Sequence, residues 1–139
     1  MRSFMLAALA AGVGLGVVAT PAAAAETTTF RLVSDGFIGT GTYEHSPAGP
    51  GAPIRISGAL AGRGLFRCAV VQVARSGPAD GVEWQTFGRQ CGPGRTRVRV
   101  EASYLFRGVK PPVRLCAGWT ASQAERGGRC DTYRPPADR

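Results

Sequence analysis

Histidine, lysine and acidic side chains are scarce in this sequence of 139 residues. It has one His, His45, and a single Lys, Lys110, and its nine acidic residues face 17 basic ones. A Ser–His–Asp triad would have to use His45, and no G-x-S-x-G elbow is present. No Lys-Ser/Thr pair follows the glycine-rich segments, which excludes a P-loop. We therefore expect neither a catalytic residue nor a cofactor.

Closely spaced cysteines are also missing. The four cysteines are separated by 22, 24 and 13 residues, and no C-x-x-C pair occurs. Structural zinc sites use tight knuckles, so this spacing predicts no metal site. The cysteines are Cys68, Cys91, Cys116 and Cys130.

The N-terminal segment Met1–Ala25 has the pattern of a secretory signal peptide. Arg2 precedes an apolar stretch, Phe4–Ala19, and Pro21 is followed by an alanine tract that fits the A-x-A cleavage rule. The apolar stretch is too short to span a bilayer, and no cysteine lies near the cleavage site to carry a lipid. We expect a secreted protein, with no transmembrane segment and no lipid anchor. In an oxidising compartment the even number of cysteines predicts two disulfides.

The remaining residues, 26–139, read as one domain of about eight short strands with turn signals between them. The clearest strand is Arg95–Tyr104, in which Val98 and Val100 alternate with arginines. Leu65–Ala74 is nearly all apolar, which is typical of a strand covered on both faces. We predict an all-β fold, a small antiparallel β-sandwich (Ig-like or barrel-like) of about 7–8 strands, with a frayed tail from about residue 135. The other strands are expected at Thr27–Val33, Phe37–Glu44, Ile54–Leu60, Val82–Cys91, Val113–Trp119 and Cys130–Arg134, with a helical turn at Thr120–Arg126.

Hairpin geometry favours one of the three possible disulfide pairings. If Leu65–Ala74 pairs with Val82–Cys91, Cys68 faces Gln90, next to Cys91. In the last hairpin Cys116 and Cys130 are almost symmetric about the loop. Directly opposed strand residues lie within disulfide range, so we expect Cys68–Cys91 and Cys116–Cys130.

The formal net charge of +8 points to an anionic partner. If the strands that hold Arg97 and Arg114 pair, they form a compact cationic patch near Tyr104 or Phe106, suited to single-stranded nucleic acid or a glycan polymer. The alternative is that these arginines are the ordinary solvated side of a sheet. The candidate patch residues are Arg95, Arg97, Arg99, Arg107, Lys110 and Arg114.

Two further functions remain open. The loop Ala121–Gly128, tethered by Cys116–Cys130, would present Arg126 as in a protease inhibitor, and the Pro-rich loop His45–Pro53 is another presenting surface. A small basic hydrolase or nuclease would use Glu44 and His45, although neighbours on a strand point to opposite faces.

Two single residues have simpler interpretations. We expect His45 to be an exposed loop residue. Trp119 is in phase with Val113, Leu115 and Ala117, and we expect it in the core.

The general plan, an exported domain of about 110 residues with many strands and two disulfides, resembles the apoproteins that carry enediyne antibiotics. That resemblance implies a ligand-carrying sandwich and assigns no residue. The function we predict is a secreted, non-catalytic binding or interaction module. Its expected partner is an anionic polymer or another protein.

Overall fold

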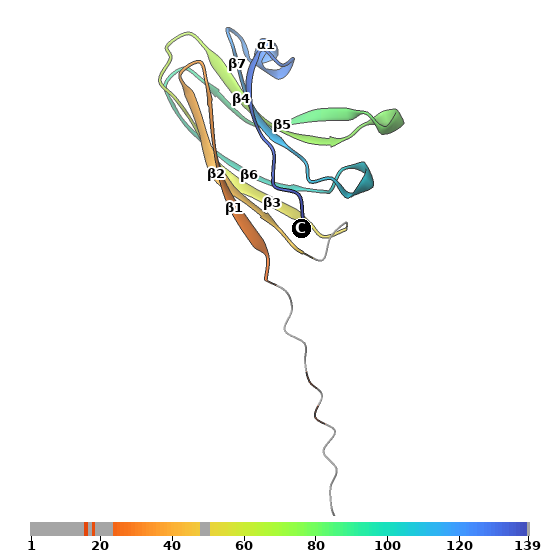
Figure 1. Ribbon diagram of the computed structural model, residues 1–139. Helices are drawn as coiled ribbons and strands as arrows, with labels where there is room; N and C mark the ends of the chain where they lie inside the picture. The colour runs from red at the N-terminus through yellow and green to blue at the C-terminus, as the bar shows by residue number, and fades with distance from the viewer. Residues whose placement is uncertain (1–15, 17, 19–23, 48–50, 139) are drawn as a thin grey trace, which may run out of the picture.

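Two antiparallel four-stranded sheets lie face to face in the computed structural model, which describes residues 24–47 and 51–138 together with Gly16 and Val18 (Figure 1). The first sheet has the order β1-β2-β3-β6 and the second the order β5-β4-β7-β8. The predicted β-sandwich of eight strands is therefore confirmed. The predicted signal peptide lies almost wholly outside the described residues. The strands are β1 Glu26–Ser34, β2 Phe37–His45, β3 Ile54–Gly62, β4 Cys68–Ser76, β5 Val82–Cys91, β6 Gly94–Ala102, β7 Val113–Gly118 and β8 Arg129–Tyr133, and α1 is Ala121–Glu125.

The core lies between the sheets because apolar side chains alternate with polar ones along most strands. On β6, for example, Val98 and Val100 are buried while Arg97 and Arg99 are exposed. No helix among the described residues is long or apolar enough to cross a membrane. The largest core side chains are Phe30, Leu32, Phe37, Tyr43, Ile54, Ile56 and Leu60 from the first sheet and Val71, Val73, Val113 and Leu115 from the second.

Strand β4 is covered on both faces, as its apolar run predicted. Helix α1 packs on its outer side, where Val70, Cys116 and Ala124 form a second buried cluster. The buried Gln72 amide links β4 to α1 by donating to the Glu125 carbonyl at 3.1 Å. The strand begins at Cys68, however, and Leu65 and Phe66 are exposed in the preceding loop. The predicted start at Leu65 is wrong because residues 63–67 extend beyond the pairing with β5 and β7.

Both disulfides join directly opposed residues of neighbouring strands, and the favoured pairing is confirmed. Cys68–Cys91 ties β4 to β5 and Cys116–Cys130 ties β7 to β8, each with Cα atoms 4.0 Å apart. A bulge between Val71 and Gln72 shifts the register by one residue, which brings Cys91 rather than Gln90 opposite Cys68. Each outer strand of the second sheet is thus covalently fixed to its inner neighbour.

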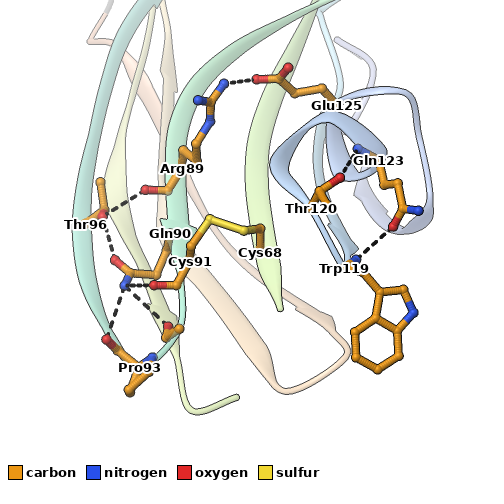
Figure 2. The surroundings of a disulfide bond; sticks show 11 residues. Cys68, Arg89, Gln90, Cys91, Pro93, Thr96, Trp119, Thr120, Gln123 and Glu125 are labelled. Carbon is orange, nitrogen blue, oxygen red and sulfur yellow. Dashed lines mark hydrogen bonds and ion pairs between the residues drawn. A yellow bond between two sulfur atoms is a disulfide. The ribbon is translucent and has the colours of Figure 1, made fainter. Parts of the chain in front are cut away.

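The chain passes from the second sheet to the first through the turn Cys91–Gly94. The Gly92 N–H donates to the Arg67 carbonyl at 2.9 Å. The Gln90 side chain lies against this turn, with Nε2 3.4 Å from the Pro93 carbonyl and Oε1 accepting from Thr96 Oγ1 at 2.7 Å (Figure 2). The strands β5 and β6 on either side of this turn belong to different sheets, although they are consecutive in sequence.

Removing either disulfide should lower the free energy of unfolding by about 3 kcal/mol, because each closes a loop in the unfolded chain. The sequence separations are 23 and 14 residues, so the Cys68→Ala/Cys91→Ala variant should lose slightly more than Cys116→Ala/Cys130→Ala. Urea unfolding measures both values. Alkylation of four thiols in the unreduced protein would contradict both bridges.

Substitution of Gly94 should destabilise the turn between the sheets. Gly94 has φ +141°, and an added Cβ would stand 2.7 Å from Gln90 Nε2. We expect Gly94→Ala to cost about 1–3 kcal/mol in urea unfolding. The control is Gly64→Ala, whose Cβ would have its nearest neighbour, Arg67 Cβ, at 4.0 Å. Equal unfolding midpoints for the two variants would argue against this role of the turn.

Candidate functional site

The outer face of the first sheet carries an ordered array of arginine and hydroxyl side chains. The register places Arg31, Thr40, Ala59 and Arg97 in one row across the four strands. The next row holds Thr29, Thr42, Ser57 and Arg99. We call this set, together with Arg95, the arginine face.

The arginine face is hollowed along its middle. A groove of about 1010 Å³ is lined by Thr40, Thr42, Ser57 and Ala59 on its floor and by the β6 arginines on one side. Gly41 and Gly58, which are paired in the register, also line it. A Cβ at Gly41 would stand 2.5 Å from the Ser57 carbonyl oxygen and 2.8 Å from the Phe30 ring. The groove is therefore open, polar and bounded by positive charge.

The arginines of this face are unpaired with acidic groups in the described part of the chain. Among the described residues none of the four forms an ion pair, and Glu101, the acidic residue nearest to Arg99 along β6, pairs with Arg55 at 3.3 Å. The hydroxyls bind one another, with Thr42 Oγ1 3.0 Å from Ser57 Oγ. The uncompensated charge can therefore act on a ligand. The four residues are Arg31, Arg95, Arg97 and Arg99.

The structure brings together only half of the predicted patch. Arg95, Arg97 and Arg99 lie side by side on β6, but β6 pairs with β3 and not with β7. The pairing with the strand of Arg114, on which a single compact patch was conditional, does not occur, because β6 lies in the first sheet and β7 in the second. Arg107 lies in the 3-10 turn η2, Phe106–Gly108, and is exposed there.

Arg114 is held on the second sheet by other contacts. Its guanidinium lies 4.0 Å from the centre of the Trp84 ring, and its Nε donates to Gln72 Oε1 at 2.8 Å. Burial lowers the pKa of Arg114 below its ordinary value. This side chain braces β7 against β4 and β5.

Lys110 is buried and paired with the C-terminal tail. Its ammonium donates to the Pro136 carbonyl at 2.7 Å and lies 2.6 Å from Asp138 Oδ1. Sequence reasoning counted Lys110 as a surface charge and missed Arg31, which belongs to the arginine face. The first hairpin, centred on Asp35 and Gly36, places Arg31 beside Thr40. The sequence does not reveal that the same sheet extends from β2 through β3 to β6.

His45 is buried, and the prediction that it is an exposed loop residue is wrong. It is the last residue of β2 and is 3% exposed. Every second residue of this strand faces the core, and after Tyr43 the next such residue is His45. Its Nε2 is 3.3 Å from Glu26 Oε2, and its Nδ1 is buried without a partner among the described residues. Glu44 pairs with Arg55 in the register, so Glu44 and His45 do not converge as a hydrolase would require.

A cluster of possible metal ligands surrounds His45. Ligand atoms of Glu26, His45 and Asp138 lie within 4.8 Å of one another. The Lys110 ammonium already neutralises Asp138, and both acidic residues are exposed at the surface. We assign no metal to this cluster.

The end of the sandwich near the disulfides holds a second concave site. Trp119 is 62% exposed there, so the prediction that it is a core residue is wrong. Strand β7 ends at Gly118, and the Trp119 N–H donates to Gln123 Oε1 at 3.0 Å as the chain turns into α1 (Figure 2). The alternation along β7 therefore stops one residue before Trp119.

Arg126 lies at the rim of this end pocket. It is exposed and caps α1 with helical backbone angles, φ −73° and ψ 0°. The predicted helical turn is confirmed. The loop that a protease inhibitor would present is therefore helical here. Recognition by strand addition requires an extended segment instead.

A third concavity lies between the ends of the two sheets. Hollows of about 320 and 330 Å³ share Ser76, whose Oγ accepts from the Phe106 N–H at 2.9 Å. Phe87 and Tyr104 line the first hollow, and Phe106 and Val109 line the second. The ligand-carrying sandwich implied by the resemblance stays a prediction.

Comparison with known proteins adds no assignment. No family model, no curated protein and no solved structure matches this chain.

The C-terminal tail should detach at low pH. The hydrogen bond from Lys110 lowers the pKa of Asp138 below its ordinary value, so the attachment is present at neutral pH and is lost as the pH falls through that lowered pKa. Lys110→Met should release residues 135–138 at pH 7, seen as sharpened amide resonances of the tail. Arg55→Met, which breaks an exposed pair elsewhere, should leave the tail signals unchanged. Identical tail spectra for the wild type and Lys110→Met would contradict this contact.

Proposed function

We propose that this protein is an extracellular, non-catalytic binding module that holds an anionic polymer on the arginine face. The single observation that carries this proposal is the group of four exposed arginines on one sheet face, none of which forms an ion pair among the described residues. Three of them line a groove that has hydroxyl groups on its floor. Such a field attracts polyanions and releases their counterions on binding.

The dimensions of the face suit a chain-like ligand. Strands in a sheet are about 4.8 Å apart, so Arg31 and Arg97 at the two ends of a row are separated by on the order of 14 Å. Arg97 and Arg99 alternate along one strand and are about 7 Å apart. A polymer lying in the groove would meet the β6 arginines along one margin and hydroxyl groups beneath it, and Arg31 lies further along the same row on β1.

The extracellular setting is supported by the chemistry of the cysteines. All four are paired, and such bonds persist in oxidising compartments. The signal-peptide pattern of residues 1–25 agrees with this setting.

A charge-matched pair of variants tests the proposal. Arg31, Arg97 and Arg99 are changed together to Gln, and the control changes Arg75, Arg107 and Arg134, which are exposed outside the face. Binding of labelled heparin to residues 26–139 is measured by anisotropy over a range of NaCl concentrations. The first variant should reduce the slope of log K against log salt by about 2–3, because each phosphate- or sulfate-type contact contributes slightly less than one.

The control should keep the slope of the wild type. An equal reduction of this slope in the two variants would show that net charge alone attracts heparin and would contradict a binding role for this face. Retention of the full slope by the first variant would also contradict it.

A further inference from the structure

The pocket at the disulfide end is formed by segments that are distant in sequence. Asp35 comes from the turn between β1 and β2, Arg67 precedes β4, and Trp119 follows β7. Gln123, Arg126 and Arg129, from α1 to the start of β8, complete a pocket of about 350 Å³. The Cys116–Cys130 bond fixes the two strands on either side of α1. The pocket therefore rests on a rigid base.

A single carboxylate holds two guanidinium groups in this pocket. Asp35 is 18% exposed, and its Oδ2 lies 2.6 Å from Arg67 Nη1 while its Oδ1 lies 3.3 Å from Arg129 Nη1. Each arginine has further N–H donors available for a ligand. With Arg126 the pocket has three positive charges and one negative charge, so it favours an anion.

Trp119 supplies a flat apolar surface beside these charges. The Arg67 guanidinium lies 4.3 Å from the centre of the indole on one face. Even with this contact the residue is 62% exposed, so much of the ring remains accessible to a ligand. Its backbone is fixed by Gln123, and Figure 2 shows the ring projecting away from α1. A ring with one side covered and the other open offers a stacking surface.

We propose that this pocket binds a carboxylated sugar ring. The apolar face of the pyranose would stack on the accessible part of Trp119, and its carboxylate would pair with Arg126 and with Arg129, which Asp35 holds. The remaining hydroxyls meet polar groups such as the Gln123 amide at the rim. A volume of about 350 Å³ is at the small end of ligand sites, which suits one ring rather than a polymer.

This site is separate from the arginine face in its residues and in its ligand size. It can bind a single sugar even if the arginine face binds no polymer. The two proposals can therefore fail independently.

The test follows the two indole N–H resonances of residues 26–139 during titration with sodium glucuronate. We expect a saturable shift of Trp119 and none of Trp84, whose ring is covered by Arg114. Glucose lacks the charge and acetate lacks the ring, so each should bind at least tenfold more weakly. Uridine 5′-monophosphate tests a nucleotide as the alternative occupant.

Variants separate binding from folding. Trp119→Ala should abolish the chemical-shift changes that glucuronate causes in the neighbouring Gln123 amide. Arg126→Gln should weaken glucuronate binding several-fold. Phe66→Ala, which removes another exposed aromatic side chain, should leave the affinity unchanged. Equal affinity for acetate or glucose, tighter binding of the nucleotide, or no saturable shift with the wild type would overturn the proposal.

Discussion

The turn Cys91–Gly94 is the constraint on which the arrangement of the two faces depends. It carries the chain from one sheet to the other within a few residues, held by the Cys68 disulfide on one side and by Gln90 on the other. After this turn β6 pairs with β3 and adds its arginines to a face that already holds Arg31.

The two outer faces consequently differ in chemistry. The second sheet covers its outer side with α1, two disulfides and the stacked pair of Arg114 and Trp84, so little of it is free for a ligand. Within the part of the chain that the structure describes, the first sheet has no such cover, and its outer side is open, cationic and rich in hydroxyls. Stability elements are thus concentrated on one sheet and uncompensated charge on the other.

Local patterns predicted the strands and the disulfides well. Turn residues and alternation define each hairpin, and a hairpin fixes which cysteines face each other. The burial of a residue was predicted wrongly where the alternation of buried and exposed residues was extended past the end of a strand or ended before it. Trp119 lies just after β7 and is exposed, whereas His45 still belongs to β2 and is buried.

Local sequence patterns specify the all-β class, the strand boundaries to within a few residues and the two cross-strand bonds, because these depend on neighbours along the chain. Which strands share a sheet, and therefore which charges share a surface, depends on tertiary packing. Arg31 and Arg97 lie on one face because β2 and β3 intervene between their strands. Asp35, Arg67 and Trp119 meet because three turns end at the same side of the sandwich. Such long-range pairing depends on how two apolar faces pack together, which no short segment encodes.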